Sequence, residues 1–325
     1  MLCEKPYYAI IDKDNRLRFL NSEEVKRIEN DEITLLNFPR PSPTSPLLLT
    51  YKVIKIPCGK CDTCRESLGA EWALRCWLEA LQYEHNQFIT LTYTPEKEPM
   101  SGVEKVHLTK FMHDVRQYFR RKRNHVGIRF FGCGEYGRIS ARPHYHVLLF
   151  NCPPFGDEKF HRKGKYGQDI YISETLNRLW QNGYCSIGTV TKHSIEYVTR
   201  YEYKKVETKR KRLRNDEFIH MSRRKGLGVD YLINHLEQII REDKSLLPNG
   251  KKPTIPRYFN RKIKFLIGKK RFENEIVKPR IYRAKCFYAK ETERTGLSRE
   301  EIEKQRINQI KKQINRRKHH YTRTD

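Results

Sequence analysis

Two runs of β-forming residues on either side of a short polar stretch constrain the fold of this 325-residue chain more than any other feature. The first run is Ile128–Glu135 and the second is Pro143–Phe150. The residues between them, 136–142, include Gly137 and several charged or hydroxyl side chains. Polar stretches of this length that contain glycine commonly connect neighbouring antiparallel strands. The sequence therefore predicts a β-hairpin over these residues.

The second strand of this hairpin carries two imidazoles on one face. Side chains alternate between the faces of a strand, so His144 and His146 point one way and Tyr145 points the other. The hairpin also brings Glu135 close to the two histidines. Two nitrogens and a carboxylate oxygen suit Mg²⁺ or Mn²⁺, which makes these three residues candidate metal ligands. The alternative is a half-buried strand with structural histidines, in which Glu135 forms a salt bridge.

A second segment has the periodicity of a helix. Tyr197 and Tyr201 are four residues apart, and Lys204 and Lys205 follow Tyr201 by three and four residues, so all four share one helix face. A phenol with a pKa of about 10 is a weak nucleophile at neutral pH. It needs a nearby cation and a metal-polarised phosphate, and a lysine can stabilise the charge that develops. We interpret the tyrosines as candidate nucleophiles and either lysine as the helper cation; the alternative is an aromatic stripe against the core.

Eight short motifs follow one another along roughly residues 55 to 230. They are Pro57–Cys64, Trp72–Cys76, Phe88–Tyr93, Cys133–Gly137, Arg142–His146, Gly183–Gly188, Tyr197–Lys205 and Met221–Gly228. Their combination resembles the HUH endonucleases. It is most similar to the two-tyrosine replication initiators of the microviruses, which are small phages with circular single-stranded DNA, and especially to the gokushovirus branch.

This resemblance implies rolling-circle replication. One strand is nicked at the origin through a 5′-phosphotyrosine, and strand joining later releases circular single-stranded DNA. The resemblance also implies that Tyr197 and Tyr201 alternate as nucleophiles, and that His144 and His146, with Glu135, hold the metal. It further implies a central antiparallel sheet of the HUH type, flanked by helices, with the tyrosine helix beneath the metal-binding strand.

Two functions of other classes fit the same residues. A transposase or plasmid relaxase of the HUH type would use the same metal and tyrosines on another substrate. Two tyrosines four residues apart favour repeated strand transfer and therefore a replication initiator. A non-catalytic single-stranded DNA-binding or packaging protein would depend on charge alone, and its histidines would be structural.

The composition favours nucleic acid as the partner. The chain has 66 Lys and Arg residues against 39 Asp and Glu, a net charge of +27, which attracts polyanions. Its 19 tyrosines and 15 phenylalanines can stack on unpaired bases of single-stranded or origin DNA. A solvated basic surface is the alternative for any one cluster. The candidate DNA-binding residues are Arg120, Arg121, Lys122, Arg123, Arg142, Arg200, Arg223 and Arg224.

The sequence also indicates which activities come from elsewhere. It contains no G-x4-G-K-[ST] motif, so we expect a helicase and a polymerase of the host to act as partners. It contains no apolar run of about 18 residues and no apolar signal core at its start. We therefore expect a protein of the bacterial host cytoplasm with no membrane partner.

Three of the nine cysteines have a spacing suited to metal. Cys58, Cys61 and Cys64 form C-x2-C-x2-C, which can wrap Zn²⁺, with Cys76 as a candidate fourth ligand. Free thiols are the alternative. Four other cysteines are expected to be small apolar fillers: Cys3, Cys133, Cys152 and Cys185.

The order of patterns along the chain predicts an α+β fold, because helices are interspersed with strands that include an antiparallel hairpin. We expect an irregular N-terminal lead-in (1–55), a Cys-rich segment with a helix (56–86), the HUH endonuclease core (87–206) and a basic C-terminal extension (207–325). Helices are expected over 66–85, 107–123, 172–181, 193–205, 229–240 and 298–316. Further strands are expected over 88–94 and 184–190, and a loop over 153–169.

Overall fold

The computed structural model describes residues 2–11, 16–21, 35–38, 49–137, 140–164, 167–200, 214–245, 247 and 250–322. The chain divides into two compact units. The smaller combines residues 1–67 with 291–324, and the larger comprises residues 68–290. Helix α2 (Asp62–Ala80) begins in the smaller unit and continues into the larger one. Within the described residues, no helix is both long and apolar enough to cross a membrane.

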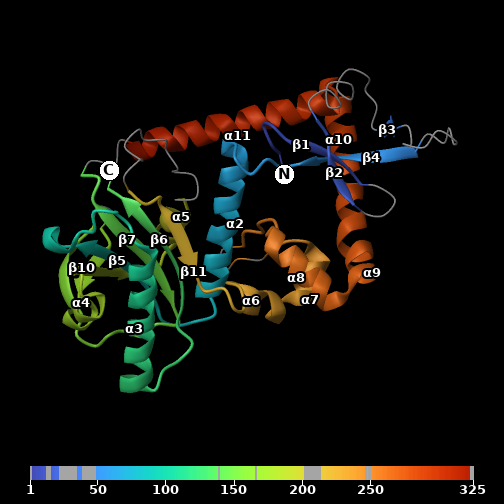
Figure 1. Cartoon of the computed structure of the whole chain (residues 1–325). Helices are drawn as coiled ribbons and strands as arrows, with labels where there is room; N and C mark the ends of the chain where they lie inside the picture. The colour runs from blue at the N-terminus through green and yellow to red at the C-terminus, as the bar shows by residue number, and fades with distance from the viewer. Residues whose placement is uncertain are drawn as a thin grey trace. The chain divides into compact units, whose positions relative to one another are not determined.

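A seven-stranded antiparallel sheet is the centre of the larger unit (Figure 1). Its strand order is β11-β6-β7-β5-β10-β9-β8, and each neighbouring pair is antiparallel. The strands are β5 (Asn86–Tyr93), β6 (Arg129–Tyr136), β7 (Pro143–Phe150), β8 (Lys159–Lys163), β9 (Asp169–Ile172), β10 (Gly183–Thr189) and β11 (Phe218–Met221). The predicted α+β fold with a central antiparallel sheet is confirmed. The expected loop over 153–169 was wrong in part, because it contains β8.

One face of this sheet packs against α3 (Lys105–Arg123) and α4 (Glu174–Trp180). The buried side chains of α3 recur with helical spacing, as its sequence predicts. They join Leu149 of β7 and Trp180 in one hydrophobic cluster. A short 3-10 helix, η1 (Pro95–Lys97), precedes α3.

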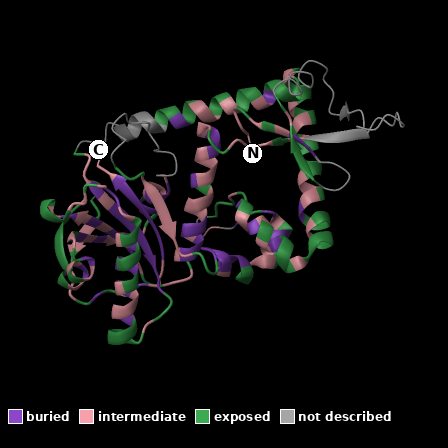
Figure 2. Cartoon of the chain, viewed as in Figure 1, coloured by how far each residue is buried: buried purple, intermediate pink, exposed green. Residues whose placement is uncertain are grey.

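The opposite face of the sheet packs against α2 and α5 (Lys192–Thr199). Leu148 and Phe150 of β7 form a second cluster here with Ile195 of α5. Because helices cover both faces, β7 is buried along almost its whole length, as Figure 2 shows. A polar side chain on β7 is therefore held in a rigid and largely dry setting.

Gly183 begins β10 in close contact with the backbone of a neighbouring strand. A Cβ at this position would lie 2.2 Å from the Thr92 carbonyl oxygen and 2.6 Å from the Thr94 nitrogen. Backbone atoms cannot rotate away, so we expect Gly183→Ala to lower the free energy of unfolding by about 1–3 kcal/mol in urea denaturation. Gly188→Ala in the same strand is the control, because its nearest contact is an ordinary 3.5 Å to the Phe88 ring. Equal losses in both variants would contradict this explanation.

A third hydrophobic cluster lies under a set of helices in the larger unit, around Tyr231, Ile239 and Phe259. The expected helix over 229–240 is two helices, because His235 leaves helical geometry (φ −119°, ψ 21°) and stacks on Tyr231. The helices are α6 (Val229–Asn234), α7 (Leu236–Glu242), α8 (Arg257–Ile267), α9 (Lys269–Phe272), the π-helix η3 (Glu273–Val277) and α10 (Lys278–Thr295).

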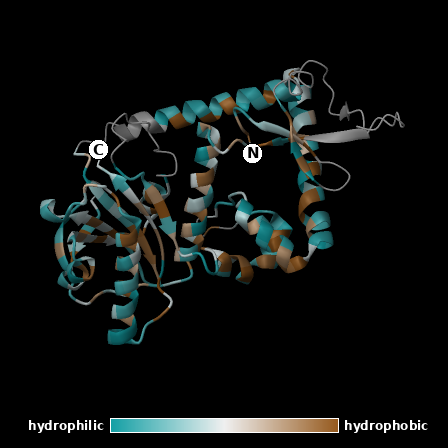
Figure 3. Cartoon of the chain, viewed as in Figure 1, coloured by the Kyte–Doolittle hydropathy of each residue, from teal (hydrophilic) through white to brown (hydrophobic). Residues whose placement is uncertain are grey.

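The smaller unit contains a four-stranded antiparallel sheet of order β2-β1-β4-β3 and the helix α11 (Arg299–Thr322). Its strands are β1 (Tyr7–Ile11), β2 (Leu17–Phe19), β3 (Leu35–Phe38) and β4 (Leu49–Ile56). The expected irregular lead-in over 1–55 was therefore wrong. The central pairing joins β1 to β4, some forty residues further on, which local sequence does not reveal. Figure 3 shows that α11 is hydrophilic along most of its length.

Candidate active site

The central hairpin of the larger unit brings three candidate ligands together. Across β6 and β7, Glu135 pairs with His144 and Cys133 pairs with His146. Residues directly opposite each other in an antiparallel pair point to the same face. Glu135, His144 and His146 therefore share one face of the sheet, the face that α5 covers.

These three residues are in mutual contact. Nε2 of His144 lies 2.8 Å from Oε1 of Glu135, and Nε2 of His146 lies 3.0 Å from the same oxygen. One ligand atom from each residue falls within 4.8 Å of the other two. Glu135 and His146 are buried, at 2% and 7% exposure, so water competes little for these atoms. The set offers two nitrogens and one carboxylate oxygen to a single ion.

The hydrogen bonds behind the imidazoles fix how they present their nitrogens. Nδ1 of His144 lies 3.1 Å from the Arg142 carbonyl oxygen, which only accepts, so this nitrogen carries the proton. Nε2 of a neutral His144 then faces Glu135 with a lone pair, and Oε2 of Glu135 is buried without a hydrogen-bond partner among the described residues. Acceptors that face one another in a buried site fit a bound divalent cation.

Glu135 is in the protonation state that a metal ligand requires. Burial by itself would raise the pKa of this carboxyl, but hydrogen bonds and positive charge from His144 and His146 lower the pKa to about 2. The carboxylate is therefore ionised at neutral pH.

Helix α5 begins with a capping box that fixes its start. The Thr191 side chain accepts a hydrogen bond from the backbone N–H of Ser194, and the Ser194 hydroxyl accepts one from the backbone N–H of Thr191. This reciprocal pair satisfies two N–H groups that the helix leaves without partners. From this start, Ile195 and Val198 enter the core beneath β7.

The same helix brings Tyr197 to the candidate ligands. Its hydroxyl donates a hydrogen bond to Oε1 of Glu135 at 3.3 Å and lies 3.3 Å from Nε2 of His146. Its ring packs edge-on against the His146 ring, with centroids 5.0 Å apart. The structure thus brings together a phenol and three candidate ligands that are distant in the sequence. Tyr201, Lys204 and Lys205 lie outside the described residues, so their roles stay predictions.

Two of the candidate DNA-binding arginines have contacts within the protein. Arg142 donates a hydrogen bond to the Tyr93 carbonyl oxygen at 2.7 Å and lies 3.6 Å from a carboxylate oxygen of Glu98. Arg200 follows the last turn of α5 and pairs with Glu196 at 3.3 Å. Arg142 therefore also holds the end of the hairpin on β5.

The other candidate DNA-binding residues lie in two places. Arg120, Arg121, Lys122 and Arg123 form the exposed last turn of α3, where Arg123 donates a hydrogen bond to the Phe155 carbonyl oxygen. Arg223 and Arg224 are exposed and line an open groove of the larger unit. Five basic side chains and one acidic side chain line this groove, which favours a polyanion: Arg116, Arg129, Arg223, Arg224, Lys225 and Asp230.

Thr90 is a site residue that the sequence did not single out. It pairs with His146 across β5 and β7, and its hydroxyl lies 3.1 Å from Nδ1 of that histidine. A partner on the outer nitrogen orients a metal-binding imidazole. The alternation within Phe88–Tyr93 places Thr90 on one face, but only the strand register shows which histidine it meets.

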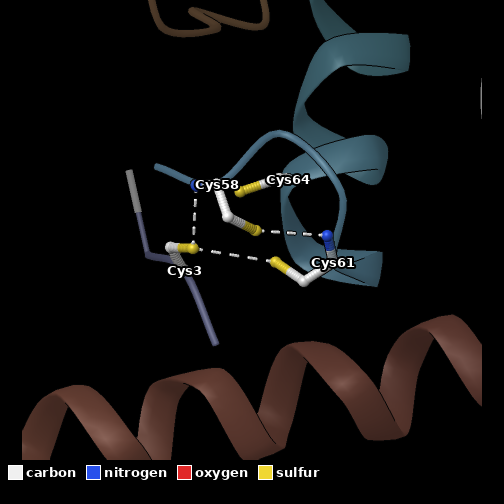
Figure 4. Close-up of side chains that lie close together, drawn as sticks. All are labelled: Cys3, Cys58, Cys61 and Cys64. Carbon is white, nitrogen blue, oxygen red and sulfur yellow. Dashed lines mark hydrogen bonds between the residues drawn. The ribbon is translucent and has the colours of Figure 1, made fainter. Parts of the chain in front are cut away.

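The cysteine prediction needs two corrections. Cys58, Cys61 and Cys64 come together as expected, but the fourth member of their cluster is Cys3 and not Cys76 (Figure 4). Cys76 lies twelve residues after Cys64 on α2, about 18 Å along the helix axis, and is buried in the second hydrophobic cluster. Cys3 is thus no apolar filler, whereas Cys133, Cys152 and Cys185 are buried as predicted.

Comparisons with known proteins agree with this geometry. The family model of the replication-associated protein ORF2 matches residues 86–206, from β5 to beyond α5. Replication-associated protein ORF2 of Spiroplasma virus 4 is 36% identical over 219 residues, which are 64% of this chain and 67% of that protein. Replication-associated protein VP4 of Bdellovibrio phage phiMH2K is 33% identical over 62% of this chain and 65% of its own length. Replication-associated protein ORF4 of Chlamydia phage 1 is 29% identical over 66% and 54%. No solved structure matches the chain significantly.

Proposed function

We infer the chemistry of this chain from its family, because it belongs to the replication-associated proteins of bacteriophages and its role is in phage replication. Within that role, the chain initiates rolling-circle replication by a metal-dependent cut in one strand at the origin. The observation that carries the proposal is the Tyr197 hydroxyl, which lies 3.3 Å from both Glu135 and His146. A nucleophile beside a metal-binding triad is the arrangement that phosphoryl transfer to a tyrosine requires.

The cut is a transesterification in which Tyr197 acts as the nucleophile. Its oxygen forms a bond to the phosphorus of the scissile phosphate, and the bond from phosphorus to the 3′ oxygen breaks. The phenolic proton passes to the Glu135 carboxylate, which already accepts its hydrogen bond, and from there to water. The 3′ oxygen takes up a proton from water, and the 5′ phosphate stays on the tyrosine. The free 3′ hydroxyl can then prime synthesis.

The metal site proposed for this reaction consists of Glu135, His144 and His146. Mg²⁺ or Mn²⁺ bound there would polarise the phosphate and stabilise the negative charge that develops on it. The protein holds the two imidazoles in place through Thr90 and the Arg142 carbonyl group. These contacts support the proposal, because ligands that are already oriented bind metal without further ordering.

A second transfer would complete the cycle. By its spacing, Tyr201 shares a helix face with Tyr197 and would attack the junction that one round of synthesis regenerates. The 3′ hydroxyl of the displaced strand would then attack the first phosphotyrosine, which closes a circle of single-stranded DNA. Lys204 or Lys205 would stabilise the charge in these steps. A helicase and a polymerase of the host would open and copy the duplex, in the cytoplasm of the bacterial cell.

Peptide mapping of the covalent adduct tests this function. The full chain is incubated with Mn²⁺ and single-stranded DNA fragments that tile the genome encoding it, and the adduct is digested with nuclease and trypsin. The peptide His193–Arg200 contains Tyr197 as its only tyrosine, and Tyr201–Lys204 contains Tyr201. We expect a 5′-linked nucleotide on these peptides, and none when the metal is chelated. An adduct on other peptides would overturn the proposal.

The same assay separates the two alternative functions. A non-catalytic DNA-binding or packaging protein would bind the fragments and yield no adduct at all. A transposase or relaxase of the HUH type would yield the adduct but prefer a hairpin or a transfer-origin substrate over the replication origin.

The basic groove is proposed to bind single-stranded DNA, and its salt dependence tests this. Each phosphate contact on a single strand contributes about 0.7 to the slope of log Kobs against log salt concentration. We expect Arg223→Ala/Arg224→Ala to weaken binding and to reduce that slope by about 1.4 in fluorescence anisotropy titrations. Lys285→Ala/Lys290→Ala removes the same charge from exposed positions of α10 and serves as the control. Equal slopes for the two double variants would exclude the groove as a binding site.

A further inference from the structure

Four cysteine sulfurs from two separate stretches of the smaller unit converge at one point, as Figure 4 shows. Cys3 comes from the segment before β1, and Cys58, Cys61 and Cys64 come from the segment that leads into α2. All four sulfurs lie within 4.8 Å of one another. We propose that these cysteines bind one structural zinc ion, and this proposal does not depend on the DNA chemistry above.

The sulfur spacing matches a zinc site and not a disulfide. The sulfurs of Cys3 and Cys61 are 3.8 Å apart, and all nine cysteines of the chain are free thiols. A disulfide requires a sulfur–sulfur distance of about 2.05 Å. Four sulfurs placed tetrahedrally at about 2.3 Å from a zinc ion are about 3.8 Å from one another. The observed spacing therefore equals that of a zinc site with four cysteine ligands.

The backbone around these cysteines stabilises thiolates. The N–H groups of Lys60 and Cys61 point at the sulfur of Cys58, at 3.4 and 3.3 Å, and the N–H of Cys58 points at the sulfur of Cys3, at 3.3 Å. Gly59 allows this turn because its φ is +72°, a value that other residues rarely adopt. Hydrogen bonds to a sulfur favour its charged form, which is the form that binds metal.

The start of helix α2 contributes in the same direction. Cys61 precedes the first residue of α2, and Cys64 lies in its first turn, where the unpaired N–H groups carry partial positive charge. Burial opposes ionisation of Cys61, but hydrogen bonds, chiefly from Thr63, lower its pKa to about 6. Burial and the neighbouring thiols raise the pKa of Cys64. The charge of a bound cation would let all four sulfurs ionise together.

The N-terminal segment is held on α2 by a second set of contacts. The backbone N–H of Thr63 donates to the Glu4 carboxylate at 3.3 Å, and Lys311 of α11 pairs with the same carboxylate at 2.7 Å. Cys3 is thus held beside the C-x2-C-x2-C segment by its own neighbour in the chain. A site in which the protein already positions the ligands binds metal with little further ordering.

The smaller unit also lacks the apolar core that would otherwise hold it together. Among its described residues, the buried hydrophobic side chains are Ala9, Ile10, Cys64, Ile302 and Ile314. The three hydrophobic clusters found in the described part of the chain all belong to residues 68–290. Small units with little apolar burial often depend on a metal for stability. A zinc ion would here join the chain before β1 to the start of α2.

X-ray absorption at the zinc edge tests the proposal on the full wild-type chain, purified without chelators. We expect a first shell of four sulfurs at about 2.3 Å. This readout is independent of the proposed histidine site, whose ligands are nitrogen and oxygen. It should persist in His144→Ala/His146→Ala. Wild-type protein with no sulfur-bound metal would overturn the proposal without bearing on the nicking reaction.

Variants then identify the fourth ligand after exchange of zinc for cobalt. We expect Cys3→Ser and Cys61→Ser to lose the thiolate-to-cobalt charge-transfer absorption of a four-sulfur site. Cys76→Ser and Cys286→Ser should keep it; Cys286 is a partly exposed cysteine of α10 and is the matched control. Full absorption in Cys3→Ser, or its loss in Cys76→Ser, would overturn the assignment of Cys3.

Hydrogen exchange gives a readout that requires no variant. Removal of zinc should reduce amide protection in β1 and β4 of the smaller unit, whereas β6 and β7 of the larger unit should keep theirs. Unchanged protection in β1 and β4 after the metal is removed would exclude a structural role.

Discussion

Replacing both Tyr197 and Tyr201 with phenylalanine is expected to abolish the covalent protein–DNA adduct, whereas either single replacement should leave part of it. Phenylalanine keeps the ring that packs on His146 but removes the oxygen that would attack phosphorus. We expect the double variant to form adduct at least about a thousandfold more slowly than the wild type, because removal of a covalent nucleophile leaves no equivalent route. The measurement is the adduct yield over time on a denaturing gel, with DNA binding followed separately.

The matched control for this experiment is Tyr203→Phe. Helical spacing turns position 203 away from the face shared by positions 197 and 201, so this variant should form adduct at the wild-type rate. An adduct that persists in the double variant would contradict the assignment of both nucleophiles. Loss of DNA binding in the double variant would instead indicate a structural role for the two rings.

Replacing Glu135 with glutamine is expected to weaken metal binding and to slow adduct formation by at least about a hundredfold at a limiting Mn²⁺ concentration. The substitution preserves the shape of the side chain but removes the charge that faces His144 and His146 at 2.8 and 3.0 Å. The measurement is the adduct rate as a function of Mn²⁺ concentration, with calorimetric titration of the metal. We expect the midpoint for Mn²⁺ to rise, and added metal to restore part of the rate.

Glu79→Gln separates this effect from that of removing any buried charge. Glu79 is also fully buried, and it pairs with Arg129 at 3.1 Å and accepts a hydrogen bond from the backbone N–H of Gly228. Its replacement should lower stability but leave the midpoint for Mn²⁺ unchanged. Equal shifts of that midpoint in both variants would show that Glu135 acts through stability and not as a ligand.

Local patterns were enough to predict the centre of the larger unit. The hairpin joins β6 and β7 through a short turn, so the contact between Glu135 and His144 follows from residues nine apart in the sequence. Alternation then determines which side chains share a face. The position of Tyr197 beside this hairpin came from a family resemblance, because the periodicity of a helix does not show which strand the helix covers.

Contacts between distant residues could not be predicted in the same way. Cys3 lies 55 residues before Cys58, and nothing in the residues around it indicates where the chain returns. The pairing of β1 with β4 is equally remote, and so the first 55 residues looked irregular. Cys76 was a plausible ligand by spacing alone, but the uninterrupted helix α2 separates it from Cys64.

The register of β7 has a consequence for how molecules of this protein are sorted in the cell. A slip of one residue would turn His144 and His146 toward α3 and bring Tyr145 to the opposite face. It would also break the bonds of the Tyr145 hydroxyl to the Tyr93 hydroxyl and to both backbone groups of Glu104, and it would expose Val147 and Leu149. A molecule with that error has lost its core as well as its metal ligands, so proteases remove it. Proteolytic quality control therefore acts as a proofreading step for the active site, and the molecules that survive carry correctly spaced ligands.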